Sequence, residues 1–132
     1  MSSNHPVSDI ATRIRNGYLA YKNTISSPSS KVRVAILDIL KEEGYISGYS
    51  KTKNEKGFEN LEISLKYFNE KAVIETIETV SKPGRRVYAN CRDIPVVSNG
   101  LGMVLVSTSK GILTDHQARE SNLGGEILLK IF

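Results

Sequence analysis

Two stretches near the N-terminus repeat apolar residues at the spacing of an amphipathic helix. The apolar stripe of the first consists of Val7, Ile10, Ala11, Ile14 and Tyr18. This stripe predicts a helix over about residues 6–21, and Pro6 suits its first turn because that position needs no backbone donor. The second stripe runs from Val32 to Leu40 and predicts a helix that Gly44 ends.

Other stretches have the two-residue alternation or the unbroken apolar run of a strand. Apolar and polar residues alternate from Leu61 to Tyr67, and the segment 45–51 precedes them across a turn at 53–57, so the pair predicts a β-hairpin. The unbroken run Met103–Val106 predicts a fully buried strand, and residues 126–132 predict a closing strand.

The segment 72–81 supports two interpretations. Its apolar residues fall at helical spacing, whereas its many valine, isoleucine and threonine residues favour a strand. The residues alone leave this choice open. Beyond the turn at Pro83–Gly84, a short strand that carries cations is expected at 85–88.

A short third helix is predicted at 115–121. Thr114 is a suitable N-cap, and Gln117 has the spacing that completes a capping box. Together with the strands, this pattern predicts an α+β fold of mixed α/β content. We place the boundary between two small domains so that they cover residues 1–68 and 69–132.

Basic residues gather in two places, although the formal net charge is only +4. Up to Arg33 the chain has five basic residues and the single acid Asp9, and from Lys82 to Arg92 it has four basic residues and no acid. Lys31 and Arg33 lie in the first turn of a predicted helix, where cations oppose the helix dipole, and this placement indicates an anionic partner. The clusters favour a polyanion such as nucleic acid; ordinary solvated surface is the alternative.

The buried strand Met103–Val106 leads directly into four polar residues. We call them the hydroxyl segment: Ser107, Thr108, Ser109 and Lys110. Hydroxyl groups donate and accept hydrogen bonds, so they suit ribose hydroxyls, phosphate oxygens and base edges, and an ammonium group suits phosphate. The hydroxyl segment is therefore predicted to be a small polar reading head on a rigid strand.

Several other residues complete the predicted binding surface. Tyr88 follows Arg85 and Arg86 and is expected either to stack on a base or ribose or to be a core tyrosine. Glu126 is expected to brace the hydroxyl segment by accepting its hydrogen bonds, with an exposed carboxylate as the alternative. The remaining candidates lie on the first helix and at the start of the second: Thr12, Arg13, Arg15, Asn16, Ser29, Ser30 and Lys31.

No group of residues predicts catalysis or metal binding. Ser107 and Lys110 match the Ser-x-x-Lys spacing of penicillin-recognising enzymes, but the accompanying Ser-Asp-Asn and Lys-Thr-Gly elements are absent from the sequence. His5 and His116 have no second ligand at metal spacing, and Cys91 has no base beside it. We therefore expect no enzyme, no cofactor and no small-molecule substrate; a serine acyl-transferase acting through Ser107 is the alternative from another class.

The remaining composition bounds the setting of the protein. A single cysteine rules out an internal disulfide and fits a reducing cytosolic or organellar interior. No apolar stretch is long enough to span a membrane, and the first residues lack the apolar core of a secretion signal. We expect a cytoplasmic protein with no membrane partner.

A set of motifs occurs in a specific order along nearly the whole chain. The motifs before the hydroxyl segment are Pro6–Gly17, Pro28–Lys31, Lys41–Tyr45, Leu65–Tyr67 and Ser81–Tyr88. Those around it are Gly100–Gly102, Val106–Gly111, Thr114–Asp115, Ala118–Arg119 and Gly124–Glu126. This ordered set resembles the family of bacterial-type small-subunit ribosomal protein number eight, the universal family uS8.

The resemblance implies both a fold and a role. It implies two helices on a three-stranded sheet in the N-terminal domain, a mostly β C-terminal domain with a short helix, and a strand at 73–80. It implies a primary binding protein of the central domain of small-subunit (16S) ribosomal RNA that aids assembly of the platform. Its implied partners are the neighbouring ribosomal proteins uS5 and uS12 and, as in several members, its own operon messenger RNA.

By the same resemblance, the family's RNA contacts map onto the hydroxyl segment, with Tyr88 and Glu126 nearby. Further contacts map onto the residues that begin the second helix and onto the exposed side of the first. We call that side the polar flank: Thr12, Arg13, Arg15 and Asn16. Arg85 and Arg86 join this surface by their charge. A regulatory protein that acts mainly on messenger RNA is a second hypothesis, because the same chemistry would serve it.

Overall fold

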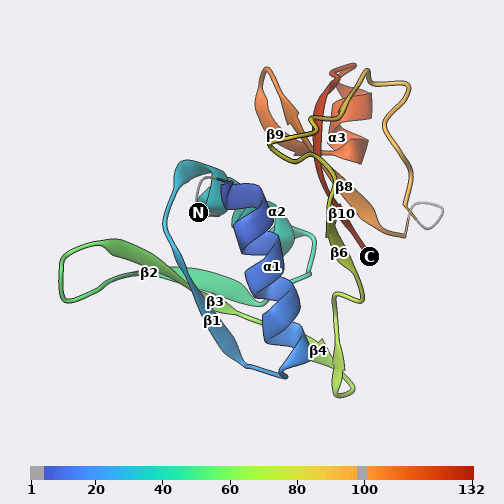
Figure 1. Ribbon diagram of the computed structural model, residues 1–132. Coiled ribbons are helices and arrows are strands. Elements are labelled where there is room, and N and C mark those ends of the chain that lie inside the picture. The colour runs from blue at the N-terminus through green and yellow to red at the C-terminus, as the bar shows by residue number, and fades with distance from the viewer. Residues whose placement is uncertain (1–4, 98–100) are drawn as a thin grey trace. The chain divides into compact units, whose positions relative to one another are not determined.

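The computed structural model describes residues 5–97 and 101–132 (Figure 1). The chain divides into two compact units, one that ends at Ile74 and one from Glu75 to Phe132. This division differs from the boundary at residue 68 that the sequence pattern indicates. The difference is the hairpin of β4 (Tyr67–Phe68) and β5 (Lys71–Ala72), whose pairing keeps it within the first unit.

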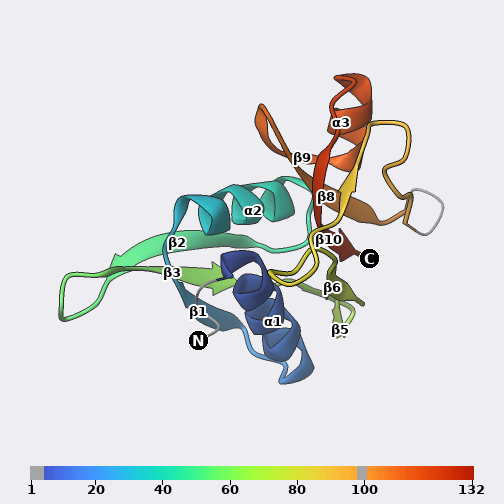
Figure 2. The same ribbon diagram turned by 45° about the horizontal axis from the view of Figure 1, so that its top comes forward.

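The first unit combines two helices with a three-stranded antiparallel sheet (Figures 1 and 2). Its other elements are α1 (Pro6–Leu19), β1 (Thr24–Pro28), α2 (Lys31–Glu42), β2 (Gly48–Lys53) and β3 (Glu59–Ser64). The sheet order is β1-β3-β2, so β3 pairs on both of its sides. Helix α1 packs on β1, and α2 packs on β2 and on α1. Both helices predicted from the apolar stripes are confirmed.

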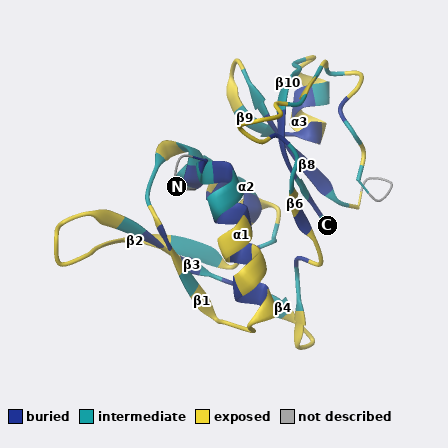
Figure 3. Ribbon diagram, viewed as in Figure 1, coloured by how far each residue is buried: buried dark blue, intermediate teal, exposed yellow. Residues whose placement is uncertain are grey.

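The core of the first unit forms where the two apolar stripes meet the sheet (Figure 3). The fully buried side chains of α1, α2 and β3 are Ile10, Ile14, Ile36, Leu37, Leu40, Leu61 and Ile63. Helix α1 approaches β1 so closely that a Cβ on Gly17 would lie 2.6 Å from Cγ2 of Ile25. This packing fixes the side of α1 that stays exposed, and with it the position of the polar flank.

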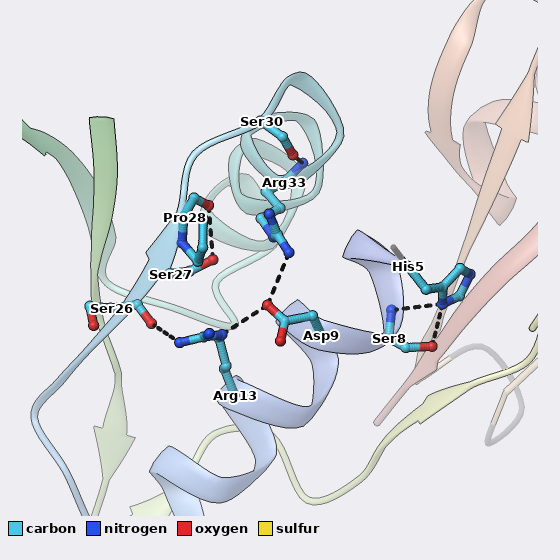
Figure 4. A network of polar contacts seen from close by, with 9 residues as sticks. All are labelled: His5, Ser8, Asp9, Arg13, Ser26, Ser27, Pro28, Ser30 and Arg33. Atoms are coloured by element: carbon cyan, nitrogen blue, oxygen red, sulfur yellow. Dashed lines mark hydrogen bonds and ion pairs between the residues drawn. The ribbon is translucent and has the colours of Figure 1, made fainter. Parts of the chain in front are cut away.

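Asp9 joins the two helices of the first unit through two arginines (Figure 4). Its Oδ2 accepts hydrogen bonds from Nε of Arg13 at 2.8 Å and from Nη2 of Arg33 at 3.0 Å. The Arg33 side chain is only 7% exposed, and Arg33 Nε is buried without a hydrogen-bond partner among the described residues. The sequence-based inference that Arg33 faces an external anion was therefore wrong, because Asp9 supplies its counter-charge from within the chain.

The second unit is built around its last strand. Its elements are β6 (Ile77–Thr79), β7 (Tyr88–Ala89), β8 (Met103–Thr108), β9 (Gly111–Thr114), α3 (Asp115–Glu120) and β10 (Gly125–Ile131). Strand β10 pairs antiparallel with β6, β7 and β8, and β9 extends the sheet beyond β8. The mixed α+β class predicted from the sequence is confirmed.

The segment 72–81 contains no helix. Ile77–Thr79 forms β6 and pairs with Leu129–Ile131 of β10, whereas residues 73–76 lie outside any strand. The backbone N–H groups of Glu75 and Thr76 both donate to the carbonyl oxygen of Phe132, at 2.7 and 2.8 Å. The helical period was therefore misleading, because pairing with the C-terminal strand satisfies this backbone in an extended form.

The predicted strand Met103–Val106 and the third helix are both confirmed. The four residues of that strand are at most 3% exposed. Thr114 caps α3: its Oγ1 accepts from Gln117 N at 3.2 Å, and Gln117 Oε1 accepts from Thr114 N at 3.1 Å. None of the helices in the described part of the chain is long and apolar enough to cross a membrane.

We expect Asp9→Ala to lower the free energy of unfolding by about 3 kcal/mol, because it leaves the buried Arg33 charge without a partner. The double variant Asp9→Ala/Arg33→Leu should recover most of that loss, since no buried charge then stands alone. Urea denaturation followed by circular dichroism measures both. Glu42→Ala removes an exposed acid from α2 and is the control. If the double variant instead loses the sum of the unfolding free energies that the two single substitutions lose, the role given to Asp9 is wrong.

Candidate nucleic-acid interface

The hydroxyl segment forms the tip of the β8–β9 hairpin. Strand β8 continues through Ser107 and Thr108, which pair with Ile112 and Gly111 of β9. Ser109 and Lys110 are the exposed two-residue turn between the strands. The segment is therefore half strand and half turn: Ser107 is paired on both of its sides, with β9 and β10, and Thr108 is paired with β9.

Thr108 stabilises this turn from within. Its Oγ1 donates to the carbonyl oxygen of Gly111 at 2.7 Å and accepts from the backbone N–H of Lys110 at 3.1 Å. Gly111 has φ +104°, a left-handed conformation that glycine tolerates best. The hydroxyl of Ser107, by contrast, makes no hydrogen bond to any described residue and is the hydroxyl of β8 that is available to a ligand.

Three predicted contact residues form one row across three strands. In the strand pairing, Glu126 of β10 lies opposite Ser107 of β8 on one side and opposite Tyr88 of β7 on the other. Directly opposed residues of a sheet project from the same face. The structure thus brings Tyr88, Glu126 and Ser107 to one face of the sheet, although they are far apart in the sequence.

A close backbone approach fixes this row. A Cβ on Gly125 would lie 2.0 Å from the carbonyl oxygen of Ser107, and one on Gly124 would lie 2.5 Å from that of Ala89. Real Cβ atoms do not approach this closely, so β10 can pair here with β8 and β7 only because both residues are glycines.

Tyr88 is an exposed tyrosine and not a core residue. Its exposed fraction is 69%, although it lies within the sheet. The core alternative for Tyr88 is therefore wrong. An exposed ring in the same row as a half-buried serine and carboxylate is available to stack on a base or ribose.

Glu126 holds the segment that leads to Tyr88. Its Oε2 accepts a hydrogen bond from Ser81 Oγ at 2.6 Å and from Arg86 Nη1 at 3.0 Å. The Ser81 hydroxyl is fully buried and also accepts from Val87 N at 2.9 Å. Glu126 thus positions residues 81–87, a role that could not be predicted from the sequence because Ser81 and Glu126 lie 45 positions apart in the chain. A direct brace from Glu126 to the hydroxyl segment stays a prediction.

The two arginines of the second unit differ in their surroundings. Arg86 forms the ion pair with Glu126, and its side chain remains 45% exposed. Arg85 is exposed at the end of a tight turn in which Lys82 and Arg85 exchange backbone hydrogen bonds of 3.0 and 2.9 Å. Lys82 is exposed in the same turn, and so are Arg92 and Lys110 elsewhere in the second unit.

The polar flank of α1 borders an open hollow of about 370 Å³ in the first unit. All four flank residues, Thr12, Arg13, Arg15 and Asn16, are exposed. Arg13 is partly occupied, because it contacts Asp9 and donates from Nη1 to the carbonyl oxygen of Ser26 at 3.0 Å. The hollow is lined by Arg13, Asn16, Gly17, Ala20, Lys22, Ile25 and Ser26. Lys22 and Ser26 were not predicted as site residues, because only the packing of β1 on α1 brings them to this flank.

A second hollow of about 460 Å³ contains the residues that begin α2. The Ser29 hydroxyl donates to Glu59 at 2.8 Å, and the Ser30 hydroxyl accepts from Arg33 N at 3.2 Å as the N-cap of α2. Lys31 is exposed. Both hydroxyls therefore have structural partners, which leaves Lys31 as the residue of this group best placed to meet an external anion.

The charge in this second hollow is mixed. Lys31 and Lys51 line it together with Asp38 and Glu59. Tyr49 donates to Asp38 Oδ1 at 2.5 Å, and this hydrogen bond, with burial and the charge of Asp38, raises the pKa of Tyr49 to about 12. A pKa that high keeps the phenol neutral and donating at physiological pH.

The structure divides the predicted residues between the two units, and in the first unit they border two separate hollows. The flank of α1 and the start of α2 belong to the first unit, and the hydroxyl segment, Tyr88, Glu126 and the arginine pair belong to the second. Among the described residues, no group of three or more His, Cys, Asp or Glu side chains could hold a metal ion. The polar groups on both surfaces suit phosphates, riboses and bases.

Comparison with known proteins gives one consistent family. The family described as "Ribosomal protein S8" matches residues 5–132. The "Small ribosomal subunit protein uS8" of Afipia carboxidovorans and that of Rhodopseudomonas palustris are each 52% identical to this chain over 132 residues, which is the whole of both chains in each pair. The protein of the same description from Nitrobacter winogradskyi is 51% identical over the same span.

We expect Gly125→Ala to destabilise the second unit by about 1–3 kcal/mol, because the new methyl group would overlap the Ser107 carbonyl. Denaturant unfolding of the whole chain measures this loss. Gly84→Ala is the matched control, since a Cβ on Gly84 meets no atom within 4 Å. If Gly125→Ala costs no more than Gly84→Ala, the close approach does not hold the row together.

Proposed function

We propose that this chain, which belongs to the ribosomal protein S8 family, binds the central domain of small-subunit ribosomal RNA. As a member of that family it is a structural, non-enzymatic constituent of the small ribosomal subunit. Family membership leaves no room for the acyl-transferase alternative at Ser107. The row of Ser107, Glu126 and Tyr88 is the observation that supports the RNA proposal most.

The row fits the surface that an RNA helix offers. An A-form helix has a wide, shallow minor groove lined by ribose 2′-hydroxyls and base edges. A hairpin tip enters such a groove without ordering new chain, and the Ser107 hydroxyl can then exchange hydrogen bonds with a ribose or a base edge. Tyr88, in the same row, would stack where a distorted helix exposes a base.

The cations have a different role in this proposal. Lys110, Arg85 and Lys82 would contact phosphates around the row, and the flank of α1 would contact phosphates on behalf of the first unit. Phosphate contacts set the position and orientation of a protein on its nucleic acid but carry no sequence information. Recognition of the particular RNA shape would then come from the row and from the spacing of the cations around it.

We assign the finer roles to the same surface. As a primary binder in the cytoplasmic ribosome, the protein would order the central-domain RNA and so aid platform assembly beside its expected neighbours uS5 and uS12. Feedback on its own operon messenger RNA requires only that this RNA present a similar shape to the same row. Cofractionation with ribosomal subunits, against recovery on messenger RNA, separates the structural role from a mainly regulatory one.

A salt-titrated binding assay tests the RNA proposal. One RNA is the central-domain helix, and the other is a regular duplex of equal length. We expect tight binding to the first that persists at salt concentrations that abolish binding to the second, because phosphate contacts alone weaken steeply with salt. Equal affinity for both RNAs with the same salt dependence would mean that phosphate contacts alone account for binding, and this result would overturn the proposal.

We expect Ser107→Ala to weaken binding to the central-domain helix by about 0.5–1.5 kcal/mol and to leave duplex binding unchanged, because it removes a neutral hydrogen-bonding group. Lys110→Ala should weaken both and reduce the slope of log K against log salt by roughly 0.7–0.9 for each phosphate that the lysine neutralises. Ser121→Ala, at an exposed serine after α3, is the control. The same loss on both RNAs for Ser107→Ala would contradict this division of roles.

A further inference from the structure

Three tyrosines of the first unit form a continuous stack. The rings of Tyr18 and Tyr67 meet edge to face, with centroids 5.4 Å apart and an interplanar angle of 72°. The rings of Tyr67 and Tyr21 lie nearly parallel, with centroids 6.2 Å apart and an angle of 17°. We call Tyr18, Tyr67 and Tyr21 the tyrosine stack.

Hydrogen bonds fix the inner members of the tyrosine stack. The Tyr67 hydroxyl donates to the carbonyl oxygen of Lys22 at 2.7 Å. The Tyr18 hydroxyl donates to the carbonyl oxygen of Tyr45 at 2.7 Å and accepts from Lys66 N at 3.1 Å. Tyr21, the outer member, therefore lies against the ring of Tyr67, whose hydroxyl group is held by a hydrogen bond.

Tyr21 itself is held in an exposed position. It is 72% exposed although Tyr67 lies along one side of its ring, so the opposite ring face is open to solvent. Its φ of +53° is in the left-handed region, which bulky side chains disfavour. Backbone hydrogen bonds of 3.1 Å from Tyr21 N to Tyr18 O and 3.0 Å from Lys22 N to Gly17 O hold this turn.

The surface next to Tyr21 is cationic. Ala20 and Lys22, its neighbours on either side, line the hollow that also contains Arg13 and Asn16. No carboxylate is among the residues that line this hollow. An open aromatic face beside a cationic groove is the arrangement with which proteins hold single-stranded nucleic acid, because every base has a face that stacks and every nucleotide has a phosphate.

We propose that Tyr21 is a stacking platform for an unpaired RNA base, and that Lys22 and the adjoining hollow hold the phosphates on either side of it. The inference rests on the proposed function for its source of RNA and adds a site in the first unit that takes single-stranded nucleotides. It needs the open ring face of Tyr21 and not its hydroxyl.

Tryptophan fluorescence reports this stacking directly. The chain contains no tryptophan, so Tyr21→Trp places a single fluorophore at the platform. The titrants are a ten-nucleotide oligoadenylate and an abasic oligomer with the same number of phosphates. We expect saturable quenching by the oligoadenylate and little by the abasic oligomer. Equal responses to both, or none, would overturn the proposal and leave the tyrosine stack to a protein partner or to no partner.

Affinity for the same oligoadenylate supplies a second measurement. Tyr21→Ala should bind roughly 5- to 140-fold more weakly, the range that loss of one base stack produces. Tyr21→Phe should bind like the original chain. Phe58→Ala is the matched control, because Phe58 is 67% exposed in the same unit and belongs to no ring pair found in the described residues. Thermal unfolding shows whether Tyr21→Ala merely loosens the fold.

The central-domain helix separates failure of this site from failure of the proposed function. If the original chain does not prefer that helix to a regular duplex, the proposed function fails whatever Tyr21 does. If the chain prefers the helix but Tyr21→Ala leaves oligoadenylate binding unchanged, only the stacking platform is wrong.

Discussion

The close approach of β10 to β8 at Gly125 is the constraint on which the second unit depends. Strand β10 is the common partner of β6, β7 and β8, so its position sets the position of every long-range pairing in that unit. With no Cβ at Gly125, the Ser107 carbonyl lies where a side chain would otherwise be. Glu126 is consequently aligned with both Ser107 and Tyr88. The candidate RNA surface is thus a direct result of how the C-terminal strand closes the sheet.

In both units, some polar groups form hydrogen bonds within the chain and others are exposed to solvent. Arg33, Ser81, Ser30 and Thr108 hold the structure together, because each makes hydrogen bonds within the chain. Exposed groups on the same elements remain for a ligand. The internal bonds therefore make each surface rigid, and rigid surfaces lose less conformational entropy when they bind.

Much of the fold could be predicted from the sequence because local signals and burial agree there. The apolar stripes of the two helices, the buried run at Met103–Val106 and the capping box at Thr114 all correspond to observed elements. The residues alone left the segment around Ile77 undecided, because its spacing and its composition favour different structures and its pairing with β10 is not local. Pairing between distant strands is a tertiary effect that can override a local preference.

The predicted site shows the same limit. Composition identified the hydroxyl segment and the cationic regions, but it did not show which of those groups have partners inside the chain. Asp9 accepts a hydrogen bond from Arg33, and Glu126 accepts hydrogen bonds from Arg86 and Ser81. These contacts join different elements of the fold. Nor did the pattern place Tyr21 against Tyr67, because the hairpin of β4 and β5 brings the second ring there.

A protein–RNA coupling experiment tests most directly whether the Ser107 row reads an RNA groove. The original chain and Ser107→Ala are each bound to the central-domain helix and to versions that carry a single 2′-deoxyribose. If the proposed recognition is right, there is one RNA position where loss of the 2′-hydroxyl weakens binding of the original chain by about 0.5–1.5 kcal/mol. The same loss should leave the binding of Ser107→Ala unchanged. Effects that add at every position would contradict it, because Ser107 would then contact no ribose hydroxyl.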